Sequence, residues 1–160
     1  MQYLRAVLMN FYLVRHGEAK AANEDPTRPL TDCGRKEVEK VARAVAAKEP
    51  EVFEILHSDK LRAKQTAEIL AQSLSPRGGV REIIGLSPED DPQVARVELE
   101  VAEAPLMLVG HLPHLSRLAS MLVTGDTEKE IVGFPAAAIL CLSRTEGGWE
   151  VRWTLVPEAV

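Results

Sequence analysis

Short apolar runs and longer amphipathic segments alternate along the chain. Apolar runs fall at residues 10–15, 53–57 and 106–109, and each is followed by a segment with apolar residues at helical spacing. The run Leu106-Met107-Leu108-Val109 has no polar position, which is typical of a central strand buried on both faces. Strands that alternate with helices predict an α/β fold in three layers (α/β/α) around a mostly parallel central sheet.

Boundary residues predict where the helices begin. Helix-starting residues open three amphipathic segments, at Thr31-Asp32, at Pro92 and at Pro113, and a fourth helix is predicted over 60–74. The segment at Thr31-Asp32 places Val38, Val41, Ala42 and Val45 on one face, and the segment at Pro92 carries Val94, Val97, Val101 and Ala102.

The C-terminal part of the chain has a different pattern. Residues 137–142 and 149–156 flank Glu146-Gly147-Gly148, which predicts an antiparallel hairpin at the edge of the sheet. A further short strand is predicted over 80–84. The whole chain, 1–160, is predicted to be one domain, with residues 1–8 as an extension ahead of the first strand.

Composition and charge narrow the classes of function. The 160 residues are 46 % hydrophobic and 27 % charged, as in an ordinary globular protein. A net charge of −5 without a basic cluster argues against a nucleic-acid partner. No apolar stretch approaches the ~20 residues of a membrane span, and the N-terminus lacks the features of a signal peptide. We therefore expect a cytoplasmic protein without a membrane partner. The sequence does not indicate its oligomeric state.

The tetrapeptide Arg15-His16-Gly17-Glu18 directly follows the first apolar run. A glycine at the end of a buried strand predicts a sharp turn. Arginine is a planar donor for phosphate oxygens, and histidine serves as a nucleophile or a proton carrier. Their adjacency at the end of a buried strand indicates phosphoryl chemistry.

Further residues of the same kind follow other predicted strands. His111 follows the run that ends at Gly110, and Arg62 lies in the first turn of the helix after the strand at 53–57. Ligand sites in such sheets form beyond the carboxyl ends of the strands, so Arg15, His16, Arg62 and His111 are expected to meet there. Two guanidinium groups can hold a phosphoryl group while a neutral His16 attacks phosphorus and His111 assists.

Four motifs in this order resemble those of the histidine phosphatase superfamily, which has the phosphoglycerate mutase-like fold. They are Arg15-His16-Gly17-Glu18, Leu30-Thr31 with Gly34, Ser58 to Ala67, and Gly110-His111-Leu112-Pro113, within about residues 9–156. The short length and the Glu18-Ala19 continuation are most similar to the SixA-like branch of phosphohistidine phosphatases. The resemblance implies a three-layer α/β fold, a catalytic tetrad of Arg15, His16, Arg62 and His111, and phosphorylation of His16 during turnover. The chain departs from the family at Asp59, in place of a proline, and at Leu112, in place of an asparagine.

The general acid has no clear counterpart in this chain. Longer mutase-like relatives carry it as a glutamate in an inserted segment; Glu82 lies in roughly that region and is the candidate here. Glu18 and Arg28 are candidate substrate-binding residues, although a solvated loop cation is the alternative for Arg28. Because a phosphoimidazole needs less protonation to leave than an alkoxide does, the expected substrate is phosphohistidine in a protein, for example a signalling domain. A small phosphorylated substrate and a non-catalytic phosphate-binding or phosphoprotein-binding module are the alternatives.

The remaining histidines and cysteines suggest no additional chemistry. His57 is expected to be packed or hydrogen-bonded in its strand, and His114 to be solvated or at the rim of the site. The four histidines lack the close spacing of zinc ligands, so neither a metal nor another cofactor is predicted. Cys33 is interpreted as a small residue at a helix start, and Cys141 as a core residue of a strand.

Overall fold

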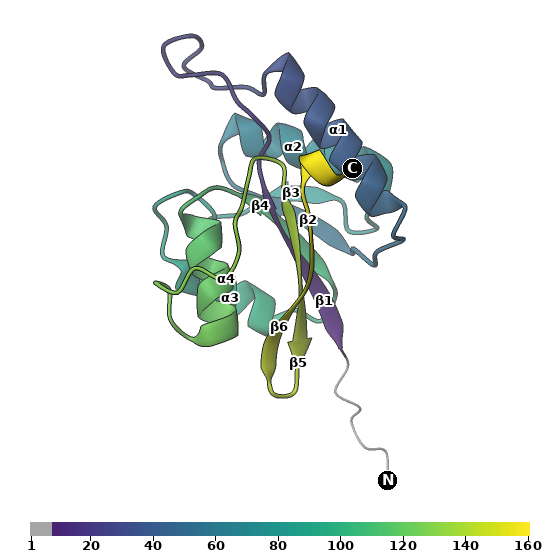
Figure 1. Cartoon of the computed structure of the whole chain (residues 1–160), viewed down its shortest axis with the longest axis vertical. Coiled ribbons are helices and arrows are strands. Elements are labelled where there is room, and N and C mark those ends of the chain that lie inside the picture. The colour runs from purple at the N-terminus through teal and green to yellow at the C-terminus, as the bar shows by residue number, and fades with distance from the viewer. Residues whose placement is uncertain (1–7) are drawn as a thin grey trace.

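The centre of the computed structural model, which describes residues 8–160, is one six-stranded sheet (Figure 1). The strands are β1 (Met9–Arg15), β2 (Glu54–His57), β3 (Val80–Glu82), β4 (Leu106–Gly110), β5 (Ile139–Thr145) and β6 (Gly148–Leu155). In the order β3-β2-β4-β1-β5-β6, the first four are parallel and the last two pair antiparallel. The mostly parallel sheet and the C-terminal hairpin are confirmed. Residues 1–7 of the expected N-terminal extension lie outside the described residues.

Two pairs of helices cover the two faces of the sheet (Figure 1). They are α1 (Asp32–Ala46) with α2 (Leu61–Leu74), and α3 (Pro92–Val101) with α4 (His114–Thr124); a short 3₁₀ turn, Pro157–Ala159, follows β6. Strand β1 contributes to both cores because its side chains alternate. Tyr12 and Val14 pack in the core that includes α1 and α2, and Phe11 and Leu13 pack in the core that includes α3 and α4. The three-layer α/β/α fold is confirmed.

The helix starts follow the predicted boundary chemistry. Thr31 caps α1, with its Oγ1 accepting a hydrogen bond from the Gly34 amide at 2.9 Å. Pro92 is the first residue of α3, and the Asp91 side chain accepts from the Gln93 amide at 3.0 Å. Both cysteines lie as expected, with Cys33 exposed in the first turn of α1 and Cys141 buried in β5.

Helix α3 presents most of its valines to the surface. It buries Ala95 and Leu99, whereas Val94, Val97 and Val101 are exposed. The helical spacing of the valines predicted the helix, but it did not specify which apolar residues of the helix face the core. None of the helices in the described residues has the length and apolar character needed to cross a membrane.

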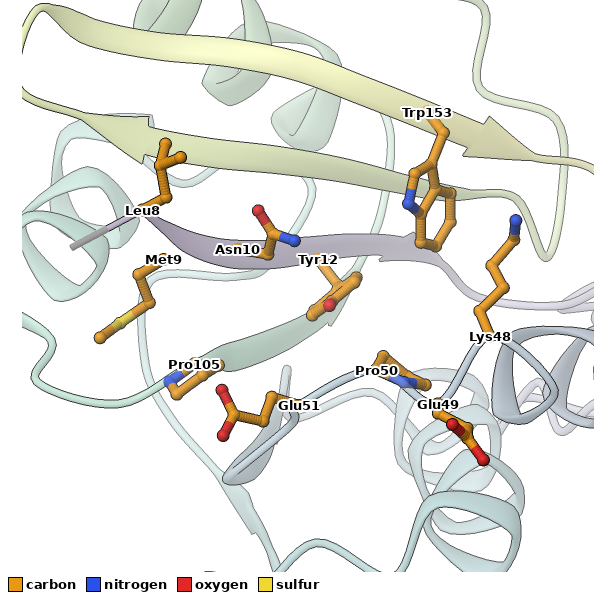
Figure 2. A pocket seen from close by; sticks show the side chains of 10 residues that line it. All are labelled: Leu8, Met9, Asn10, Tyr12, Lys48, Glu49, Pro50, Glu51, Pro105 and Trp153. Carbon is orange, nitrogen blue, oxygen red and sulfur yellow. The ribbon is translucent and has the colours of Figure 1, made fainter.

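A pocket of about 290 Å³ lies at the end of the sheet where β1 and β4 begin (Figure 2). Lys48 on its wall places its Nζ 4.9 Å from the centre of the Trp153 ring, and Glu49 and Glu51 also line it. Two carboxylates beside one ammonium do not favour an anionic ligand. The pocket also lies at the opposite end of these strands from the phosphoryl site, which is predicted at their carboxyl ends.

Candidate active site

The four residues of the predicted tetrad gather at the carboxyl ends of the parallel strands. Arg15 is the last residue of β1, His111 directly follows β4, and Arg62 is the second residue of α2. The His16 amide donates to the Gly110 carbonyl at 3.0 Å, which joins the ends of β1 and β4. The His16 and His111 rings consequently lie with their centres 4.9 Å apart. The topology of the sheet thus brings these imidazoles together from distant parts of the chain.

His16 is held in one tautomer. Its Nδ1 lies 2.6 Å from the Gly17 carbonyl oxygen, which can only accept a hydrogen bond, so Nδ1 carries the proton and Nε2 keeps a free lone pair. Burial lowers the pKa of His16 to about 4, with further lowering by the charges of Arg62, Arg15 and Arg28. The imidazole is therefore neutral at neutral pH, which a nucleophile requires.

His111 is oriented by Ser58, which directly follows β2. The Ser58 Oγ lies 2.6 Å from His111 Nε2 and accepts from the Lys60 amide at 3.3 Å; we assign its hydroxyl proton to the bond with Nε2. This network leaves the proton of His111 on Nδ1, which is buried and has no hydrogen-bond partner within residues 8–160. Burial, with His16 and Arg62 nearby, lowers the pKa of His111 to about 3. His111 can thus act as a neutral donor to a phosphoryl oxygen.

The two arginines supply positive charge and hydrogen-bond donors. Arg15 Nη1 donates to the Phe134 carbonyl at 2.8 Å, which fixes the guanidinium at the end of β1. The Nε atoms of Arg15 and Arg62 are buried without an acceptor in the described part of the chain. Burial lowers the pKa of both side chains, although arginine stays charged in proteins. Buried cationic donors of this kind favour an anion with several acceptor oxygens.

Arg28 and Glu18 occupy different positions relative to this group. The charge of Arg28 lowers the pKa of both His16 and Arg62, and its Nε donates to the Lys20 carbonyl at 2.9 Å. Arg28 thus adds positive charge to the site. The exposed Glu18 side chain instead accepts a hydrogen bond from Thr31 Oγ1 at 2.7 Å. Its carboxylate therefore contacts the N-terminus of α1, and a contact with substrate stays a prediction.

Glu82 lies at the end of the outermost strand, β3. Two strands, β2 and β4, separate β3 from β1 in the sheet. The Glu82 side chain is exposed and lines a groove together with Asp59 and Ile84. The structure does not bring Glu82 together with His16, and its role as general acid stays a prediction.

The other two histidines are both buried, which was expected for His57 but not for His114. His57 is buried, with its Nδ1 donating to the Ser58 carbonyl at 2.8 Å, as expected. The prediction that His114 is solvated or at the rim is wrong, because its side chain is 0 % exposed. His114 is the first residue of α4, but that turn packs inward, and burial lowers the pKa of the imidazole.

Polar residues of α2 hold the loops of the site in place. The Gly17 amide donates to Thr66 Oγ1 at 3.1 Å, and the Leu30 amide donates to Gln65 Oε1 at 2.8 Å. Thr66 Oγ1 in turn donates to the Arg62 carbonyl at 2.8 Å. Sequence reasoning noted these positions, and Ser58, only as parts of a motif. The signal that marks them is a polar side chain in or beside an otherwise apolar, buried segment.

The fold and this site define a class: α/β proteins that bring two arginines and a neutral imidazole together at the carboxyl edge of a parallel sheet. Within residues 8–160, no group of three or more His, Cys, Asp and Glu side chains is arranged to hold a metal ion.

Comparison with known proteins identifies the family. The profile of the histidine phosphatase superfamily (branch 1) matches residues 11–85. The phosphohistidine phosphatase SixA of Escherichia coli (strain K12) is 28 % identical over 155 residues, which cover 93 % of this chain and 94 % of SixA. An uncharacterized protein of Picosynechococcus sp. is 38 % identical over 127 residues, which cover 74 % of this chain and 76 % of that protein.

A solved structure is also similar. The protein histidine phosphatase SixA complexed with tungstate superimposes with a TM-score of 0.82 at 28 % identity, over 94 % of this chain and 99 % of the other. The chain belongs to the histidine phosphatase superfamily, and it resembles the SixA-like branch of these hydrolases.

Proposed function

We propose that this protein is a phosphohistidine phosphatase that acts on phosphohistidine in a protein, with His16 as the nucleophile. The observation that carries the proposal is the neutral His16 imidazole, whose Nε2 is free and whose ring is 4.9 Å from that of His111. Similarity to SixA, which is described as a phosphohistidine phosphatase, supports the choice of substrate.

The reaction proceeds in two displacements at phosphorus. The Nε2 lone pair of His16 forms a bond to phosphorus as the bond to the substrate imidazole nitrogen breaks, and that nitrogen takes a proton from solvent. A water oxygen then forms a bond to phosphorus as the bond to His16 breaks, and the proton of the water returns to solvent. The products are inorganic phosphate, the free substrate histidine and neutral His16.

The tetrad stabilises the charge of the transferring group in both steps. Arg15 and Arg62 each have a buried Nε–H without an acceptor in the described residues, and His111 has a buried Nδ1 in the same condition. Donors that are already in place lower the barrier because they need no reorganisation when charge spreads over the phosphoryl oxygens.

The positions of the two candidate acids, Glu82 and Glu18, favour a nitrogen leaving group over an alkoxide. Glu82 is at the far edge of the sheet, and the Glu18 carboxylate contacts Thr31. Loss of an alkoxide from a phosphate ester benefits from a general acid, whereas an imidazole leaves more readily without one. A phosphohistidine substrate therefore fits this site better than a phosphate monoester of an alcohol.

A substrate panel tests the proposal. We expect wild-type protein to hydrolyse a phosphohistidine protein and an activated aryl phosphate, whose leaving group needs no protonation, but to act poorly on sugar phosphates. His16→Ala should lose both activities, because no other group takes its place as the nucleophile. Efficient turnover of sugar phosphates with none of phosphohistidine would contradict the choice of substrate. Equal rates for wild type and His16→Ala would contradict the nucleophile.

A further inference from the structure

A groove lies between the loop after β3 and helix α3, on the side of the sheet edge where Asp59 follows Ser58. Two adjoining hollows, of about 450 and about 610 Å³, form it. They are neighbours, because Glu82, Ile83, Ile84 and Val94 line both of them. The groove is thus larger than a single phosphoryl group needs, and it runs along the outer edge of the sheet.

The end of the groove that Asp59 lines is the end nearer the tetrad, although no tetrad residue lines either hollow. Asp59 directly follows Ser58, whose Oγ contacts His111. The charge of Asp59 also acts on Arg62 and raises the pKa of that guanidinium, against the larger lowering by burial. The Ser87 hydroxyl donates to Asp59 Oδ1 at 2.9 Å and so ties the loop after β3 to the start of α2. A molecule whose phosphoryl group reached His16 could therefore continue into this groove.

The lining of the groove includes an exposed apolar patch, Ile84, Val94 and Val97, from two separate elements. Ile84 is 88 % exposed, and Val97 on α3 is 56 % exposed. Val94 lies between the two hollows and is also exposed. Apolar side chains gathered in one hollow, rather than scattered singly, are characteristic of an interaction surface.

The rim of the groove is acidic, in contrast to the cationic tetrad. The carboxylates that line it are Asp59, Glu82, Asp90, Asp91 and Glu98. Arg81 is the cation on the same lining, and its Nε is paired with Glu54 Oε2 at 2.8 Å. A ligand therefore binds more tightly if the part that lies along the groove is positively charged, while the part that meets the tetrad is an anion.

We propose that this groove docks the protein substrate, through apolar and basic side chains that neighbour its phosphohistidine. The proposal rests on the proposed function, because it assumes that the phosphoryl group is carried by a protein. A small phosphorylated molecule is too short to cover the apolar patch and offers no row of basic side chains to the carboxylates of the groove. A second copy of this chain, with its net charge of −5, is a poorer electrostatic match than a basic surface.

Three probes test the charge preference. One is a peptide with phosphohistidine between leucine and lysine residues, the second has the lysines replaced by glutamates, and the third is free phosphohistidine. We expect kcat/KM for the lysine peptide to exceed that of the other two by about tenfold or more. If all three are hydrolysed equally well, docking is wrong while phosphatase function stands. If none is hydrolysed, the proposed function fails as well.

A pair of exposed substitutions locates the preference. Ile84→Arg places a cation on the apolar patch and should raise KM for the lysine peptide about tenfold more than for free phosphohistidine. Val151→Arg, at a site on β6 that is 42 % exposed and lines neither hollow, is the matched control and should change neither value. An equal loss on peptide and free phosphohistidine would overturn the proposal. So would self-association that Ile84→Arg abolishes without an effect on the peptide, because the groove would then join copies of the chain.

Discussion

His16 combines a free Nε2 lone pair with a pKa well below neutral pH. The Gly17 carbonyl fixes the tautomer, and burial with three neighbouring arginines disfavours the imidazolium. The proposed nucleophile acts in its neutral form, so the proposal predicts that activity is retained as pH falls until His16 begins to take up a proton. The low pKa of about 4 thus extends the active range to the acidic side of an ordinary histidine.

The protonation of His16 can be followed directly. We expect the His16 Cε1 proton to show no titration in NMR spectra between neutral pH and about pH 5, where an ordinary histidine is mostly protonated. His16→Ala assigns the signal. A midpoint near the ordinary value of about 6.5 would mean that the imidazole is solvated, contrary to the geometry.

In the proposed mechanism Ser58 is a positioning residue, because its Oγ contacts His111 Nε2. Ser58→Ala removes the partner of His111 Nε2 and should lower kcat about tenfold, as for a loss of about 1.4 kcal/mol in the transition state, with a smaller change in KM. Nitrogen chemical shifts of His111 should show loss of the fixed tautomer. Ser58→Thr, which keeps the hydroxyl, should restore much of the rate. An unchanged tautomer in Ser58→Ala would refute the positioning role.

At the scale of elements, the N-terminus of α1 packs closely against the turn that follows His16. A Cβ on Gly34 would lie 2.2 Å from the Glu18 carbonyl oxygen, a backbone atom. The Glu18 carbonyl also accepts from the Thr31 amide at 3.0 Å, so the turn cannot easily retreat. Gly34 is therefore the residue that lets helix and turn approach.

Gly34→Ala should destabilise the protein although alanine is the better helix former. Helix propensity alone predicts a gain of about 1 kcal/mol, whereas the clash should cost more, with a net loss of about 1–3 kcal/mol. Urea unfolding measures the difference. Gly133→Ala, where no atom lies within 4 Å of the added Cβ, is the control and should be close to neutral. A stabilised Gly34→Ala would show that the two segments are loosely packed.

The sequence predicted where the helices and strands lie better than which of their side chains face the core. The strand at Leu106–Gly110 was recognisable because burial on both faces leaves no polar position. The exposure of Val94 and Val97 and the burial of His114 were not predictable in the same way. Which stripe of a helix packs inward depends on contacts with distant segments, and a single sequence does not specify them.

At the scale of the whole molecule, the topology explains why the tetrad could be anticipated. Parallel strands end at one edge, so residues directly after β1 and β4 and at the start of α2 must lie near each other. Ser58 was not anticipated as a functional residue because its role depends on one hydrogen bond across the edge. The distance of Glu82 from β1 depends on the order of the strands in the sheet. The alternation of helices and strands along the sequence does not specify that order.

The most direct test of the account is to trap the phosphorylated protein. Wild type mixed rapidly with a radiolabelled phosphohistidine protein and quenched in alkaline detergent should carry label that survives alkali and is lost in acid, as expected for phosphorus on nitrogen. Peptide mapping should place the label on His16, and His16→Ala should carry none. Label that survives acid, or label retained by His16→Ala, would contradict His16 as the nucleophile.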